Sequence, residues 1–313
     1  MKIQGRQRIC QEKSSERSFF SCNSLCLSLF YWTMRQKKGG VTPIRRECRS
    51  KGMKLLVCVK QVPDSEGHLS ISQEGSWVTY EDKTVFRMNR FDEFALEEAL
   101  LIRDRISHAK KTSIDAISVG PPRARLTLKK AMAMGADEGI HIREDQDRYM
   151  SPFDTASLIA SYAKDKAYDM ILAGVMAEDD MHCLVGQFIA EILEYPCATS
   201  VIHQEIINDG SEISVEREIE TGRRECLRLK LPAVLTIQSG INTPRYPSLS
   251  NVIRARDQKI ITIDAEKLQT LGKREELVLL SYPEPSSKGL FLEGTQREKA
   301  QTLLRILHEK SFI

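Results

Sequence analysis

Outside its first 52 residues, the sequence lacks paired cysteines, an excess of basic charge and any long apolar run. Single cysteines stand at Cys58, Cys183, Cys197 and Cys226, without a Cys-x-x-Cys pair. This spacing argues against a zinc site and a disulfide framework, and it fits a reducing cytoplasmic compartment. Residues 18–34 form an apolar stretch that is too short and too polar for a confident bilayer span, so we expect no membrane-spanning segment.

Basic charge is concentrated in residues 1–52, which hold twelve Lys and Arg residues, three acidic residues and four of the eight cysteines. The whole chain carries +3, so the remainder is acidic at about −6 and a nucleic-acid partner is not expected. Met53 opens the run MKLLVCVKQVPD, which reads as a protein start on its first strand. We therefore expect residues 1–52 to lie outside the fold. An upstream extension of the gene model before a start at Met53 is the preferred explanation, and a targeting leader is the second.

From Met53 onward, apolar strands alternate with amphipathic helices. We expect strands over 54–60, 113–119, 140–142 and 169–173, and helices over 92–106, from the 120–122 turn to 134, over 151–164 and over 184–193. Asp92 is the expected N-cap of the first helix. This alternation predicts an α/β fold with a doubly wound, mostly parallel, Rossmann-like sheet that binds ligands at the carboxyl ends of its strands.

A predicted hairpin interrupts the alternation of strands and helices, and a polar tail follows it. Residues 213–219 and 227–231 alternate apolar and charged side chains around Thr221 and Gly222, which predicts an antiparallel hairpin before a buried strand at 233–237. After Ile263 a polar tail leads to a helix over 295–309. We expect a nucleotide-binding α/β domain over 53–263 and a C-terminal arm over 264–313 that contacts a partner subunit.

One strand-to-helix loop, Gly174 to Gln187, has the composition of an anion cradle. A glycine at a strand end and free amides at a helix start suit a phosphate. We expect a bulky residue at Gly174 to lower nucleotide content before it lowers fold stability. His182, alone in this loop, is expected to be solvated.

Several long motifs resemble the electron transfer flavoprotein beta subunit family. They are VEREIETGRRECLRLKLPAVLTIQSGINTPR over 215–245, SVGP over 118–121 and AMAMGADEG over 131–139, within a resemblance that runs from Met53 to about Ile263. The resemblance implies a heterodimer in which an alpha subunit holds most of an FAD and this chain holds AMP. Such a carrier passes electrons from acyl-CoA dehydrogenase-type flavoenzymes to an acceptor and does no substrate chemistry itself. Some members hold a second FAD instead of AMP, but the Thr-Ala-Gln-Val-Gly-Pro loop expected for them is missing, so AMP ranks first.

The resemblance also assigns the cofactor-binding residues. By position they are Cys58, Lys60, Asn89, Phe91, Asp92, Val119, Gly174, Asp179, Asp180, Cys183, Leu184, Val185 and Gly186. Val119 would contact the adenosine, and Leu184 stands where the family usually has glutamine. A small core residue is an equally good reading of Cys58. Arg90 replaces the usual proline of the segment before the first helix.

The resemblance places a partner-docking anchor at the hairpin tip. Arg223, Arg224 and Glu225 stand there, and arginine replaces the apolar anchor that the family carries. Two roles for these arginines are equally supported. They dock a non-standard flavin dehydrogenase electrostatically, or they are a plain solvated surface.

Two other function classes remain open at this stage. An adenylating enzyme could use a similar sheet, but it needs a Ser-Gly-Gly pyrophosphate loop where this chain has residues 60–64, KQVPD. A nucleotide-sensing module without a redox partner would have no need of a hairpin and a long arm.

Overall fold

A computed structural model of the protein describes residues 52–65, 67, 69–106, 112–145, 148–283 and 289–312. The proposed leader therefore lies outside the described residues, except for Gly52. The main sheet is built from β1 (Lys54–Cys58), β6 (Ser113–Gly120), β7 (Glu138–Arg143), β8 (Met170–Gly174), β9 (Cys197–Ile207), β10 (Glu212–Ile219), β11 (Arg223–Lys230), β12 (Ala233–Ile237) and β13 (Ile260–Asp264).

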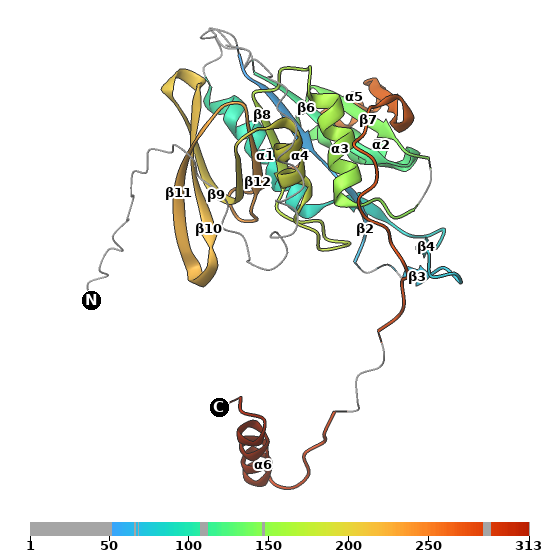
Figure 1. Ribbon diagram of the computed structural model, residues 1–313, viewed down its shortest axis with the longest axis vertical. Helices are drawn as coiled ribbons and strands as arrows, with labels where there is room; N and C mark the ends of the chain where they lie inside the picture. The colour runs from blue at the N-terminus through green and yellow to red at the C-terminus, as the bar shows by residue number, and fades with distance from the viewer. Residues whose placement is uncertain are drawn as a thin grey trace, which may run out of the picture.

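The nine strands lie in the order β11-β10-β9-β12-β8-β1-β6-β7-β13 (Figure 1). All strands from β9 to β13 in this order run parallel. The strand β10 pairs antiparallel with both β9 and β11, and the predicted hairpin of β10 and β11 lies at one edge of the sheet. The expected doubly wound, mostly parallel sheet with a hairpin extension is therefore confirmed.

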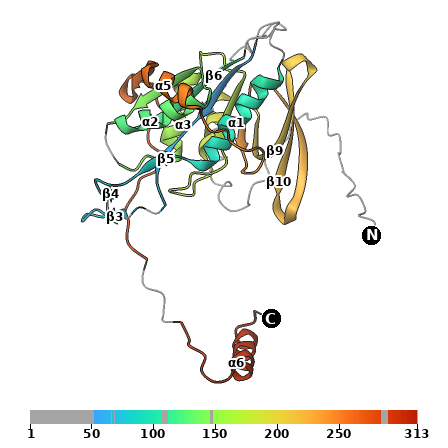
Figure 2. The same cartoon turned by 180° about the vertical axis from the view of Figure 1, so that it is seen from behind.

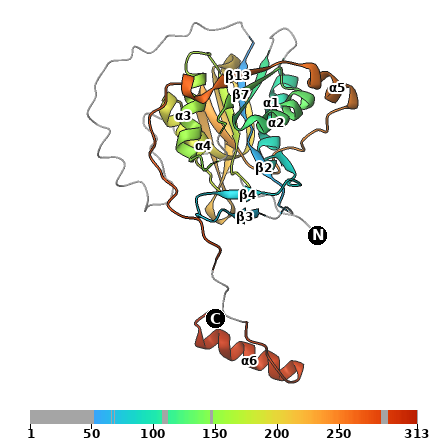
Figure 3. The same cartoon turned by 90° about the vertical axis from the view of Figure 1, so that its right-hand side faces the viewer.

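Helices cover both faces of the sheet. Figure 3 shows α3 (Pro152–Ala163) and α4 (Val185–Leu193) on one side, and α1 (Arg90–Arg105), α2 (Arg125–Met134) and α5 (Leu249–Asp257) on the other. The central strand β1 explains this layering, because Leu55 and Val57 enter one hydrophobic core while Leu56 and Cys58 enter the other. Burying an aliphatic side chain of this kind stabilises the fold by about 1.5–3 kcal/mol. Because β1 is apolar on both faces, it is stable only between two layers of helices.

Helix ends follow the local sequence with one exception. Ser151 caps α3 by accepting a hydrogen bond from the Asp154 amide at 3.0 Å, as its position before Pro152 predicts. The expected N-cap at Asp92 is wrong. The helix α1 begins two residues earlier, after Asn89, and Asp92 is its third residue. The Asp92 carboxylate instead binds amides of two other segments.

The hairpin has the predicted turn, and several small strands were not anticipated. Thr221 and Gly222 have positive φ values of 65° and 67° at the tip between β10 and β11. The chain before α1 forms two short antiparallel pairs, β2 (Gln61–Pro63) with β5 (Phe86–Met88) and β3 (Leu69–Ile71) with β4 (Val78–Tyr80). The strands β9 and β13 extend the parallel sheet on both sides.

The C-terminal arm crosses the α3 side of the domain before it reaches α6 (Gln296–Glu309). The Leu271 amide donates to Ser157 Oγ at 3.0 Å, and the Leu280 amide donates to the Gly75 carbonyl at 2.8 Å. Thr295 and Glu298 form a capping box at the start of α6, whose side chains are all at least partly exposed. In Figures 1 and 2, α6 lies apart from the sheet. Among the described residues, no helix combines the length and the apolar character needed to cross a bilayer.

Candidate functional site

The site expected from the topology lies between the carboxyl ends of β1 and β8. The chain runs outward from β1 through β6 and β7 on one side, and then returns to place β8 on the other side of β1. Ligands bind in the crevice at such a reversal of strand order. The loops after Cys58 and Gly174 therefore lie at the same end of the sheet, as predicted.

Asp92 joins the ends of these two strands. Its Oδ2 accepts from the Lys60 amide at 2.7 Å and its Oδ1 accepts from the Gly174 amide at 3.0 Å. The side chain is buried beneath the start of α1. Burial raises the pKa of Asp92 to about 7, although both amide donors and the Lys60 cation favour its charged form.

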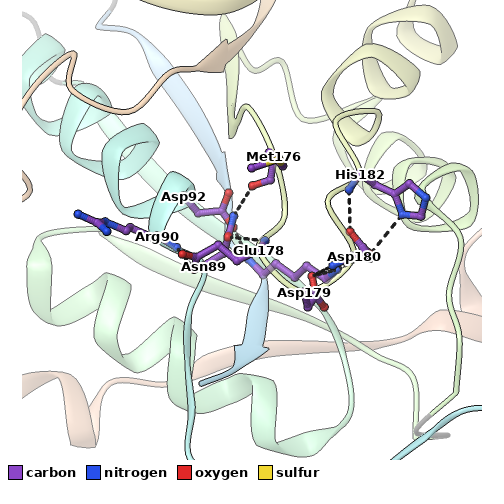
Figure 4. Close-up of polar contacts among 9 residues, drawn as sticks. Asn89, Arg90, Asp92, Met176, Glu178, Asp179, Asp180 and His182 are labelled. Carbon is purple, nitrogen blue, oxygen red and sulfur yellow. Dashed lines mark hydrogen bonds and ion pairs between the residues drawn. The ribbon is translucent and has the colours of Figure 1, made fainter. Parts of the chain in front are cut away.

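Asn89 fastens the start of α1 to the loop after β8 (Figure 4). Its Nδ2 donates to the Met176 carbonyl at 2.9 Å, and its Oδ1 accepts from the Glu178 amide at 3.1 Å. The Arg90 amide in turn donates to Glu178 Oε2 at 3.0 Å. The segment that resembles the family therefore positions the loop mainly through Asn89 and a backbone amide. A proline at position 90 could not provide that amide.

Gly174 is required by packing. A Cβ atom at this position would lie 2.5 Å from Asp92 Oδ1 and 2.7 Å from the Phe91 carbonyl carbon. A Cβ at Gly186 would lie 2.4 Å from Thr236 Cγ2 of β12. Both glycines thus allow a helix start to approach the sheet closely, which gives a physical reason for them other than the expected approach of a phosphate.

Lys60 closes the 178–182 loop over the end of β1. Its Nζ lies 2.7 Å from Asp179 Oδ1 and 2.8 Å from Asp180 Oδ2. Burial lowers the pKa of Lys60, but the two carboxylates outweigh burial and the net shift is upward. For Asp180, burial raises the pKa and the Lys60 cation more than reverses that effect. The His182 amide donates to Asp180 Oδ1 at 3.0 Å, and the side chain of His182 is 38% exposed, with Nδ1 3.4 Å from Asp180 Oδ2.

The start of α4 offers donors without an internal partner. Leu184 is its N-cap and supplies no side-chain hydrogen bond. The first amides of a helix have no intrahelical acceptor, so those of Val185 and Gly186 are available to an anionic group. Leu184 and Met181 are exposed by 41% and 64%, and Cys183 is exposed as well. The backbone of this loop fits an anion, whereas its side chains add little polar recognition.

The remaining nucleotide candidates have simpler surroundings. Cys58 is buried, and burial followed by the charge of Asp92 raises the pKa of its thiol, which makes it a neutral core residue. Val119 lies one strand away on β6 and packs against the α3 and α4 core. The next carbonyl, that of Gly120, accepts from His141 Nε2 at 2.9 Å and from the Glu144 amide at 3.1 Å. Sequence reasoning missed His141, because nothing in the run EGIHIR distinguishes it from an ordinary strand residue.

The hairpin tip is held by its own side chains. Glu225 binds Arg217 Nε at 2.7 Å, Arg224 lies 3.6 Å from Glu216, and Arg223 Nε donates to Thr221 Oγ1 at 3.1 Å. The tip lies on the edge strand β11, remote in the sheet order from the ends of β1 and β8. The two arginines are therefore exposed charges within a local network.

Exposed apolar side chains gather at a different place, on the loop before α5 and on α5 itself. Tyr246, Leu249 and Ile253 are exposed by 97%, 76% and 52%. Arg245 anchors this loop, because its Nε and Nη2 each lie 2.9 Å from an oxygen of the buried Glu97, and its Nη2 also lies 2.9 Å from Asp104 Oδ2. Sequence reasoning did not single out these apolar residues.

Within the described ranges, no three His, Cys, Asp or Glu side chains are placed to hold a metal ion. At the carboxyl ends of β1 and β8, the site thus combines backbone donors, one neutralised lysine and one buried carboxylate. This arrangement can bind and orient a nucleotide.

Comparisons with known proteins agree with this geometry. The family described as electron transfer flavoprotein domain matches residues 76–268. The electron transfer flavoprotein subunit beta of Mus musculus is 33% identical over 247 residues, covering 78% of this chain and 94% of the relative. The subunits of the same description from Methylophilus methylotrophus and Bacillus subtilis are each 30% identical, and cover 82% and 83% of this chain and 98% and 99% of the relatives. Belonging to the electron transfer flavoprotein family, the chain is an electron transfer protein of the beta-subunit type.

Proposed function

We propose that this chain is one half of a heterodimeric electron carrier and does no substrate chemistry itself. An alpha subunit would hold most of the FAD, and this chain would hold AMP at the crevice between β1 and β8. Bound FAD would supply the redox chemistry, while the chain positions it and supports its partner. The observation that carries the proposal is the fastening of Asn89, Asp92 and Gly174 around the strand ends, in a chain of this family.

The crevice supports a nucleotide held mainly by backbone groups. The free amides of Val185 and Gly186 would receive a phosphate, and Val119 would lie against the adenosine. Lys60 is neutralised by Asp179 and Asp180, so its role would be to shape the loop. The shortage of polar side chains at 182–185 favours AMP, or a sparsely occupied site, over a second FAD.

Two surfaces support docking of a flavin dehydrogenase. The first is the tip formed by Arg223, Arg224 and Glu225, where recognition would be electrostatic and sensitive to salt. The second is the exposed apolar set Tyr246, Leu249 and Ile253, which has the character that the resemblance led us to expect at the tip. The firm anchoring by Arg245 favours the second surface, because an anchor held rigidly loses little entropy on docking.

The arm supports the proposed contact with the alpha subunit. None of the side chains of α6 is buried, and Leu303 and Leu304 are exposed by 47% and 51%. A helix that leaves apolar residues exposed gains stability when they are covered, and an alpha subunit is the proposed cover. A cytoplasmic location is proposed for the assembly, because the sequence after residue 52 contains no Cys-x-x-Cys pair.

The test is co-expression of this chain with a candidate alpha subunit. We expect a stable heterodimer with a flavin absorption spectrum, from which mass spectrometry of the denatured sample releases AMP as well as FAD. For docking, Leu249→Ala should slow electron transfer from the cognate dehydrogenase, whereas Leu126→Ala, a matched change at an exposed residue of α2, should not. Equal rates for both variants would remove the apolar docking surface.

A further inference from the structure

A cavity lies at the opposite end of the parallel strands from the proposed nucleotide site. It has a volume of about 410 Å³ and adjoins the amino-terminal ends of β7 and β13. Its walls come from α1, from the turn between α2 and β7, from the loop before α5 and from α5 itself. We call it the arginine pocket, because Arg103, Arg245 and Arg254 line it together with a single acidic residue, Asp137. This volume lies within the range of small-molecule sites.

The three arginines differ in how far they are neutralised. Arg245 is bound by Glu97 and Asp104. Arg103 donates to the Gly135 carbonyl at 3.0 Å and lies 3.5 Å from Asp137, whose Oδ2 also accepts from the Ile114 amide at 2.8 Å.

The guanidinium of Arg254 is different, because no hydrogen bond or ion pair to another described residue involves it. One full cation with a planar fork of donors therefore lines the pocket without an acceptor in the part of the chain that the structure describes.

An acceptor without a donor lines the same pocket. Gln258 Oε1 is buried and has no hydrogen-bond partner among the described residues. A buried polar atom without a partner is unfavourable, so a ligand that donates a hydrogen bond to it gains affinity. Asn251, two turns before Gln258 on α5, adds an amide to the lining. The pocket thus combines a free cation with an unmet acceptor, which suits a ligand carrying an oxyanion and an N–H or O–H group.

We propose that the arginine pocket binds a small phosphate- or carboxylate-bearing molecule, with the oxyanion on Arg254 and a donor group of the ligand on Gln258 Oε1. The site is separate from the nucleotide crevice, and the proposal does not depend on the proposed electron-carrier function. A monohydrogen phosphate group satisfies both requirements by itself, since it carries oxyanion oxygens and an O–H.

The test is titration of the full chain, in the assembly in which it purifies, with inorganic phosphate and separately with citrate. Isothermal calorimetry measures affinity, and nitrogen-15 NMR of the Arg254 guanidinium reports the contact. Arg254→Gln removes the free cation. Arg256→Gln is the matched control, because it makes the same change on the same helix at an exposed residue that does not line the pocket.

We expect saturable binding of at least one of the two anions. Arg254→Gln should weaken it by roughly tenfold or more, the size of one lost charge-assisted contact, while Arg256→Gln leaves it unchanged. Preference for phosphate or for citrate identifies the oxyanion class. The proposal is overturned if neither anion binds saturably, or if both variants weaken binding equally, because equal loss indicates nonspecific attraction to a basic surface. Flavin and AMP content are not readouts here, so failure of this test leaves the proposed electron-carrier function intact.

Discussion

Replacing Gly174 with alanine tests whether the crevice is built as described. The added Cβ would sit 2.5 Å from Asp92 Oδ1 and 2.7 Å from the Phe91 carbonyl carbon, closer than real Cβ contacts. Because the second atom belongs to the backbone, a side-chain rotation cannot relieve the clash. The start of α1 must move away from β8, which breaks the hydrogen bond from the Gly174 amide to Asp92.

The size of the effect follows from these two losses. Overpacking of a tight contact costs about 1–3 kcal/mol, and a hydrogen bond to a charged group contributes about 1.5–3 kcal/mol. Since partial relaxation relieves some of both, we expect Gly174→Ala to lower the free energy of unfolding by about 2–5 kcal/mol. Nucleotide content should fall together with stability, whereas the sequence alone predicts that nucleotide content falls first.

Urea denaturation of the purified assembly measures this change. Gly289→Ala is the matched control, because a Cβ there meets nothing within 4 Å, and it should leave the free energy of unfolding within about 0.5 kcal/mol of wild type. The reasoning is refuted if Gly174→Ala unfolds at the wild-type urea midpoint yet purifies with less nucleotide. That result would mean that the glycine serves the ligand and not the packing of α1.

Three further predictions rest on other contacts. Arg245→Leu leaves the buried carboxylate of Glu97 without its cation and should lower the free energy of unfolding, measured with urea, by about 3 kcal/mol. Adding Glu97→Gln should recover part of that loss, and no recovery would mean that the buried charge is not the cause. Carbon-13 NMR should show Asp92 titrating near pH 7 in the native state, against about 4 in the unfolded chain. The contribution of Asp92 to the free energy of unfolding therefore falls as pH rises from about 4 to about 7. A native pKa near 4 would contradict this. Arg223→Ala with Arg224→Ala should change stability by less than about 0.5 kcal/mol, and an unchanged salt dependence of electron transfer would leave the tip as plain surface charge.

The fold was predictable because its strands are short, apolar and regularly spaced. Alternation of Leu55, Leu56 and Val57 between two cores requires helices on both faces, and that requirement can be read directly from the sequence. The strands β9 and β13, which end the parallel part of the sheet, were missed, since their mixed apolar and polar side chains blur the period of two.

The candidate site was predicted at the level of loops and less well at the level of roles. The topology brings Lys60, Asn89, Asp92 and the loop after Gly174 together, as the strand order implies. Asp92 was taken for a helix cap because its local sequence favours one, yet its partners are 32 and 82 residues away along the chain. Contacts across such separations depend on tertiary packing, which no local pattern encodes.

The most direct test of the central claim is the cofactor content of the heterodimer. The chain is co-expressed with a candidate alpha subunit, the complex is purified, and its visible spectrum and its released nucleotides are measured. The account predicts a flavin spectrum that bleaches on reduction, together with FAD and AMP in the released fraction. A stable complex that lacks flavin, or a chain that binds no alpha subunit at all, would contradict the account.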